Sequence, residues 1–147
     1  MVTILHLARL VTSYPYGSPA CVSQPRHGGE PQKDREGLGI TFTKEEEEEG
    51  VFTLTINSAS DNDYFRGLLV QTKAPGFFLP GDNMVEVECT GFLGSAGNNT
   101  RAVTHADSSD KYSAIIQFQQ DEGAILEPEF DIVILRNFTT FWSNIRV

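Results

Sequence analysis

Two histidines and two cysteines are the side chains best suited to chemistry in the body of this chain. His27 lies in "PRHGGEP" and His105 in "AVTHADSSDK", and neither segment has the spacing of a nucleophile with its base or of a metal-ligand set. We interpret His105 as a strand-end side chain that bonds to backbone in the Ser/Asp-rich turn after it. The alternative is a metal site that His27 and His105 form with Asp107 or Asp110.

Sequence patterns of common enzymes are absent as well. The chain has no G-x-S-x-G nucleophile elbow and no P-loop, and "GSAGNN" at 94–99 lacks the Lys and the following helix that a phosphate-binding loop needs. We therefore expect a protein that is not an enzyme, with no catalytic residue, no cofactor and no metal.

The two cysteines, Cys21 and Cys89, show no Cys-x-x-Cys or Cys/His ligand spacing. In "MVEVECT" at 84–90, strand alternation puts Val85, Val87 and Cys89 on one face, which we expect to point into the apolar layer. An even count of two favours a disulfide over zinc, provided that the protein leaves the cytosol, and two separate buried thiols are the alternative. A bond closing this loop of about seventy residues would contribute about 4 kcal/mol in the chain-entropy model.

The elements that must position these residues are strands. "VFTLTIN" at 51–57 alternates Phe52, Leu54 and Ile56 with Val51, Thr53 and Thr55, which is typical of a strand with one buried side. "YFRGLLVQT", "YSAIIQFQ" and "EFDIVILRNF" continue the pattern from about residue 39 onward. Turn residues bound each segment, so we expect an antiparallel β-sandwich of about seven to eight strands in one all-β domain, with a small barrel as the alternative.

Length and charge limit the function classes. A chain of 147 residues with 39% hydrophobic residues is long enough to bury one core. Its formal net charge of −9 argues against nucleic acid as a partner. No run of about twenty apolar residues occurs, so we expect no transmembrane segment. The run "KEEEEEG" at 44–50 is interpreted as a solvated loop between two strands, and calcium binding is the less favoured alternative.

The first thirteen residues, "MVTILHLARLVTS", are treated apart from the domain that we place at 14–147. They are apolar in patches, but His6 and Arg9 interrupt them and they lack a basic start. A shortened or altered export signal and a disordered or helical extension are both open interpretations.

Surface positions supply the remaining candidates. Asn98 and Asn137 each begin an Asn-x-Thr triplet, and Asn98, in a turn-rich segment, is the better glycosylation candidate. We expect Phe65, Phe118, Phe130 and Trp142 to fill the core. The isolated cations that could meet anionic groups of a ligand, such as phosphates, are Arg66, Lys73, Arg101 and Lys111.

Six segments occur in an order that resembles a known family. They are "YPYGSPAC", "PRHGGEPQ", "YFRGLLVQT", "FFLPGDN", "AVTHADSSDK" and "TTFW", and they cover roughly residues 14–145. The chain resembles the reeler (reelin N-terminal) domain, especially the small secreted insect defence proteins of the noduler type. The resemblance implies an immunoglobulin-like β-sandwich, an extracellular location and a disulfide between Cys21 and Cys89.

Three functions are compatible with this resemblance. The first is a secreted innate-immune defence protein that binds microbial surface polysaccharide or lipid, such as lipopolysaccharide. The second is an extracellular matrix or adhesion module, and the third is the extracellular domain of a ferric-chelate-reductase-like membrane protein. We favour the first, because the chain is one compact domain.

Overall fold

A computed structural model describes residues 30–79, 81–87, 100–137 and 139–147. In these ranges, no helix is long and apolar enough to cross a membrane. Several sequence predictions concern positions outside the described residues: the segment 1–13, Cys21, His27, Cys89 and Asn98.

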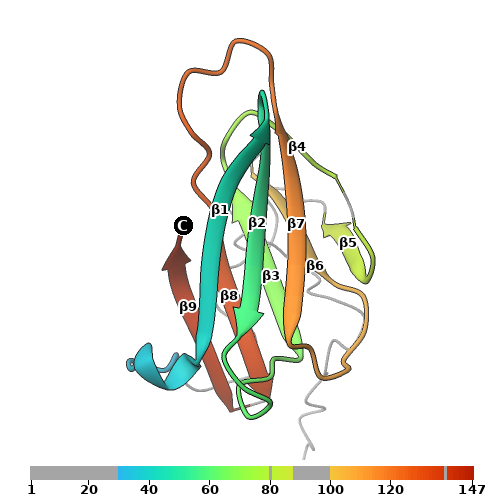
Figure 1. Cartoon of the computed structure of the whole chain (residues 1–147). Helices are drawn as coiled ribbons and strands as arrows, with labels where there is room; N and C mark the ends of the chain where they lie inside the picture. Colours follow the sequence, from blue (N-terminus) through green and yellow to red (C-terminus); the bar gives the residue numbers. More distant parts are fainter. Residues whose placement is uncertain (1–29, 80, 88–99, 138) are drawn as a thin grey trace, which may run out of the picture.

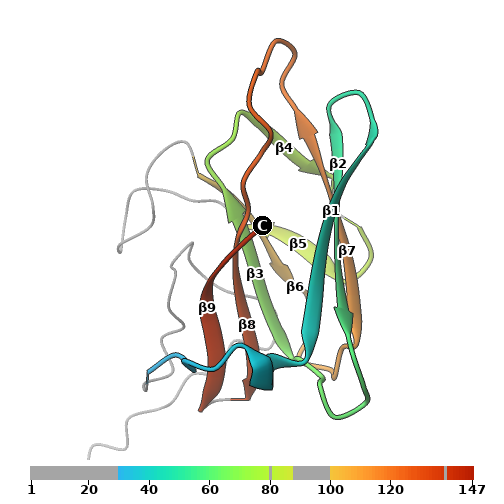
Figure 2. The same ribbon diagram turned by 60° about the vertical axis from the view of Figure 1, so that its left-hand side comes forward.

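Two antiparallel sheets face each other and make a sandwich (Figures 1 and 2). The first has the order β1 (Ile40–Glu48), β2 (Val51–Ser58), β7 (Ser113–Gln120), β4 (Gly76–Leu79). The second has the order β5 (Met84–Val87), β6 (Arg101–His105), β3 (Gly67–Thr72), β8 (Asp131–Asn137), β9 (Thr140–Arg146), and a 3₁₀ turn, η1 (Glu36–Leu38), precedes β1.

The all-β sandwich prediction is therefore confirmed, whereas the expected number of strands is too low. The described residues contain nine strands rather than seven or eight. One cause is β4, only four residues long, which is not among the strands expected from alternation. Pairing with β7 holds this short segment extended, since Phe78 lies opposite Phe118. Two separate sheets also exclude the barrel alternative.

The core lies between the two sheets, where alternation predicts it. Phe52, Leu54 and Ile56 of β2 are all buried. The expected packing role of the larger aromatic residues is confirmed, because Phe65, Phe118 and Phe130 are 0% exposed and Trp142 is 4% exposed. Phe118 contacts both Phe78 and Phe130 edge-on, with ring centres 5.1 and 5.8 Å apart. Such edge-to-face contacts stabilise a core beyond the burial of area alone.

The acidic run is mostly strand and not loop. Glu45 to Glu48 belong to β1, in which all but Glu47, at a shift in register, pair with β2. Only Glu49 and Gly50 make the turn, with Gly50 at φ 80°. Four of the five Glu can occupy this strand because β1 is at the edge of its sheet and their side chains are exposed, and like charges there discourage pairing with another chain.

The predicted orientation of β5 is wrong. Met84 packs against the main core, Val85 is 40% exposed, and Val87 packs against a second apolar cluster made by Leu69, Ala102 and Val133. The residues of this second cluster alternate along their strands with the inward-facing Leu68, Val103 and Ile132. The second cluster therefore lies on the outer face of the five-stranded sheet. Because this sheet carries apolar residues on both faces, alternation in an edge strand cannot identify which face of that strand points into the core.

Candidate functional site

The four candidate cations do not form one site. Arg66 precedes β3 and Lys111 is bridged to Phe65, so both lie where β3 begins. Lys73 follows β3 and Arg101 is paired with Thr72, so both lie where β3 ends. Six residues of strand separate the two pairs by about 20 Å. A single anionic group therefore cannot contact all four side chains.

Arg66 is engaged within the protein. Its Nε donates to Asp110 Oδ1 at 2.6 Å, and its guanidinium lies 5.2 Å from the centre of the Tyr64 ring. The hydrogen bond and charge of Asp110 raise the pKa of Arg66 above its usual value. An anionic ligand would have to compete with this carboxylate.

Lys111 has a structural role in the turn that follows β6. Its ammonium donates to the carbonyl oxygens of Arg66, Asp107 and Ser109 and to the carboxylate of Asp107 at 3.1 Å. Hydrogen bonds from Ser109, and then the Lys111 ammonium, hold the pKa of Asp107 well below its usual value of 3.8. The Lys111 side chain is only 10% exposed, so it offers little to a ligand.

His105 is part of the five-stranded sheet and not of the turn. It is 7% exposed, and its Nδ1 accepts a hydrogen bond from the backbone N–H of Leu68 at 3.1 Å. The prediction of a backbone partner is thus confirmed, but that partner lies in β3. Asp107 and Asp110 are bound by Lys111 and Arg66, and no group of three His, Cys, Asp or Glu in the described part of the chain is placed to hold a metal ion.

The side chains of Lys73 and Arg101 remain available to an anionic ligand. Both are exposed, and neither has a hydrogen-bond or ion-pair partner among the described residues. Arg101 lies opposite Thr72, the residue before Lys73. Lys73 and Arg101 are the sequence-predicted cations that could still meet an anionic group.

The outer face of the four-stranded sheet is a candidate surface that the sequence analysis did not single out. Cross-strand pairing aligns Thr43 with Thr55 and Ile115, and Thr53 with Gln117 and Leu79. We name it the threonine–glutamine face, and its members are Thr41, Thr43, Thr53, Thr55, Asn57, Phe77, Leu79, Ser113, Ile115, Gln117 and Gln119. Glu45, opposite Thr53, and Val51, opposite Gln119, border this face, and Thr53 itself is buried.

The threonine–glutamine face combines uncharged hydrogen-bonding groups with apolar groups. Hydroxyl and amide side chains can both donate and accept hydrogen bonds. Ile115 is 62% exposed, Phe77 46% and Leu79 36%. Such a surface can bind a neutral polar ligand that also has apolar patches. A signal was present in the sequence, because Thr-x-Thr occurs at 41–43 and at 53–55 with the intervening residue facing inward.

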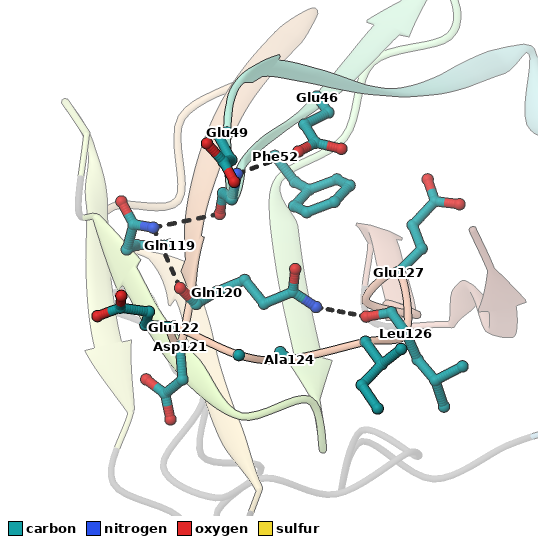
Figure 3. Close-up of a pocket in the computed structure, with 13 residues that line it drawn as sticks. Glu46, Glu49, Phe52, Gln119, Gln120, Asp121, Glu122, Ala124, Leu126 and Glu127 are labelled. Carbon is teal, nitrogen blue, oxygen red and sulfur yellow. Dashed lines mark hydrogen bonds between the residues drawn. The ribbon is translucent and has the colours of Figure 1, made fainter.

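A second candidate surface lies at the end of the sandwich where β1 turns into β2 and β7 leads into the β7–β8 loop (Figure 3). It is a hollow of about 700 Å³, which we name the acidic groove. Its lining includes five carboxylates and two exposed aliphatic side chains; the residues are Glu46, Glu49, Gly50, Phe52, Gln119, Gln120, Asp121, Glu122, Gly123, Ala124, Ile125, Leu126 and Glu127.

Asn137 is the glycosylation candidate that the structure describes. It ends β8, and its Oδ1 accepts hydrogen bonds from the N–H and the hydroxyl of Thr139, each at 3.0 Å. The amide nitrogen, to which a glycan would be joined, has no partner among the described residues. Glycosylation at Asn137 stays a prediction.

Comparison with known proteins identifies the family. The sequence pattern of the reeler domain matches residues 19–147. The chain belongs to the reeler domain family. A relative called "Putative defense protein 3", from Antheraea mylitta, is 29% identical over 149 residues, which cover 99% of this chain and 90% of the relative.

Solved reeler domains have the same fold. A crystal structure of the human F-spondin reeler domain (fragment 1) superimposes with a TM-score of 0.54 at 14% identity, covering 83% of this chain and 93% of that one. The Reelin-N domain of F-spondin gives a TM-score of 0.54 at 10% identity, covering 82% and 88%. At such identities the similarity shows the β-sandwich alone.

Proposed function

We propose that this reeler domain is a secreted, non-catalytic defence protein that binds microbial surface polysaccharide through the threonine–glutamine face. Membership of the reeler family and the similarity to a relative named as a defence protein support a role in defence. Reeler domains are typically extracellular, which supports secretion. The similarity to F-spondin extends to the fold only, so it does not favour a matrix function.

The observation that carries the choice of surface is that two neighbouring cross-strand rows of the threonine–glutamine face, those that begin at Thr41 and at Thr43, contain no charged side chain. In these rows Thr41 pairs with Asn57, and Thr43 with Thr55, whose partner on β7 is Ile115. A sugar ring presents hydroxyl groups at its rim and C–H groups on its faces, so it needs both hydrogen-bonding partners and apolar contacts. Both kinds of side chain occur here on one face of a rigid sheet.

A non-catalytic role agrees with the placement of the titratable side chains. His105 is buried and bonded to the backbone of β3, and the neighbouring Asp107 and Asp110 are bound by cations. The Thr104 hydroxyl lies 3.2 Å from His105 Nδ1, but Thr104 is 1% exposed and its hydroxyl donates to the carbonyl oxygen of Leu68, so it is not accessible to a substrate. Ser109 donates to Asp107 through its backbone N–H and its hydroxyl.

Pull-down with whole bacteria, insoluble peptidoglycan and lipopolysaccharide tests the proposal. The variants are Phe77→Ser with Ile115→Ser, which removes apolar contacts, and Thr43→Glu, which adds a charge without removing packing. The control is Lys73→Gln with Arg101→Gln, which removes the two available cations. Thermal unfolding of each variant verifies that it is folded.

The proposal predicts that both changes on the threonine–glutamine face reduce binding by about tenfold, equivalent to about 1.4 kcal/mol, while the cation variant binds like the parent. The opposite pattern would assign binding to phosphate groups at Lys73 and Arg101 and would overturn the polysaccharide proposal. A folded parent that binds none of the three materials would remove microbial binding altogether.

A further inference from the structure

We propose that the acidic groove binds a cationic amphipathic segment of another polypeptide, one in which Lys or Arg residues accompany aliphatic residues. This inference concerns a surface at the end of the sandwich and does not depend on the threonine–glutamine face. Its basis is the combination of exposed apolar side chains, unpaired carboxylates and a fixed loop around one hollow.

Two adjacent aliphatic side chains stand in water beside the groove. Ile125 is 96% exposed and Leu126 is 83% exposed, more than any other large hydrophobic residue that the structure describes. Phe52, whose side chain is buried, also lines the groove. Adjacent apolar side chains that are almost wholly exposed mark an interaction site when they border a concave surface.

The loop that carries these side chains is held in place. Gln120 Nε2 donates to the carbonyl oxygen of Leu126, as Figure 3 shows, and the N–H of Ala124 donates to the carbonyl oxygen of Asp121 at 3.2 Å. Beyond Leu126, the ammonium of Lys44 donates to the carbonyl oxygen of Pro128 at 2.8 Å. The two aliphatic side chains are therefore presented by an anchored loop, which lowers the entropy cost of binding a partner.

The carboxylates around the groove are mostly unpaired. Glu46 accepts a hydrogen bond from the N–H of Gly50 at 3.0 Å, and Glu127 lies 3.7 Å from the ammonium of Lys44. The carboxylates of Glu49, Asp121 and Glu122 have no partner among the described residues, and no Lys or Arg lines the groove. Like charges so close together repel one another, and a cationic partner would relieve this repulsion.

This combination selects one class of occupant. Nucleic acids and anionic lipids carry the same sign of charge as the groove. A lone metal ion would leave Ile125 and Leu126 in water, and the described carboxylates do not converge on one point. A second copy of this chain, with its net charge of −9, would be repelled. A segment with both cationic and aliphatic side chains satisfies both parts of the groove, and a hollow of about 700 Å³ can hold several of its side chains.

The experiment measures fluorescence anisotropy of a short labelled peptide of alternating Lys and Leu, titrated with the full chain. A peptide of alternating Lys and Ser keeps the charge but lacks the apolar side chains. The groove variants are Glu49→Gln with Glu122→Gln, and Ile125→Ser with Leu126→Ser. The matched control is Glu36→Gln with Glu86→Gln, which makes the same change of charge at exposed positions outside the groove.

We expect the Lys/Leu peptide to bind with a micromolar dissociation constant that rises at least about fivefold between about 50 and about 300 mM salt. The Lys/Ser peptide should bind about tenfold more weakly, as should the Lys/Leu peptide to the Ile125/Leu126 variant. The Glu49/Glu122 variant should lose about fivefold and the control less than about twofold. No binding of the Lys/Leu peptide, equal binding of both peptides, or equal losses in the groove and control variants would overturn the proposal.

Bacterial pull-down with the same groove variants separates the two proposals. The acidic groove and the threonine–glutamine face use different side chains at their centres, so the groove variants should capture bacteria as the parent does. Loss of bacterial capture together with loss of peptide binding would show one shared site and would overturn the groove as a separate site.

Discussion

The guanidinium of Arg136 lies 4.9 Å from the centre of the Trp142 ring. From this position it donates hydrogen bonds to the carbonyl oxygens of Tyr64 and Leu38, each at 2.9 Å, while Trp142 Nε1 donates to the carbonyl oxygen of Asp34 at 2.9 Å. The pair thus joins β8 and β9 of one sheet to the segment that enters β1 of the other. One cation and one indole fasten the two layers together at this end.

Arg136→Met should destabilise the protein by about 2–3 kcal/mol, because two backbone carbonyl groups lose a charged donor in a place that water reaches poorly. The Arg136 side chain is 15% exposed, against 65% for Arg146, which pairs with the equally exposed Glu129. Arg146→Met should therefore change stability by less than about 0.5 kcal/mol. Urea unfolding of both variants measures the difference, and equal values would contradict this role of Arg136.

Gly76→Ala should destabilise by about 3 kcal/mol, a value typical of overpacking combined with backbone strain. Gly76 has φ 151°, and a Cβ atom there would lie 2.2 Å from the backbone oxygen of Gln119 in the neighbouring strand. Gly37 offers the matched control, since its nearest neighbour to an added Cβ is a side-chain oxygen of Asp34 at 3.5 Å. If thermal unfolding shows similar midpoints for Gly76→Ala and Gly37→Ala, the close approach of β4 to β7 is not as described.

Asp107→Asn should lower stability at neutral pH by an amount that disappears in acid. The hydrogen bonds from Ser109 and the charge of Lys111 depress the pKa of Asp107 in the folded state below 3.8. A depressed pKa stabilises the folded protein above the unfolded-state pKa, and this stabilisation is lost as the pH falls below about 4 toward the folded-state value. Urea unfolding at several pH values should show the parent and the variant converging below about pH 4, and a constant difference would exclude this contribution.

Cys21 and Cys89 should form a disulfide in protein secreted through an oxidising compartment. The prediction rests on their even number and on the resemblance to the reeler family, since both positions lie outside the described residues. Titration of thiols in the unfolded, unreduced protein should find none, and reduction should release two. Two reactive thiols before reduction would refute the bond.

The sequence alone was sufficient for the class of fold and for most of the core. Alternation in β2 identified Phe52, Leu54 and Ile56 as buried, because a strand with one covered face repeats its polarity every two residues. It failed at β5, where Val85 turned out to be exposed, and in the acidic run, where Glu45 to Glu48 are strand. In both places an edge strand is defined by its pairing partner more than by its own residues.

Only the tertiary structure decided which surface residues are neighbours. Thr43, Thr55 and Ile115 are far apart in the chain but adjacent in register across β1, β2 and β7. Conversely, Arg66 and Lys73 are close in sequence but lie at opposite ends of β3. A strand carries its own polarity pattern, whereas the partner of each residue depends on strand order and register, which arise from long-range packing of the whole core.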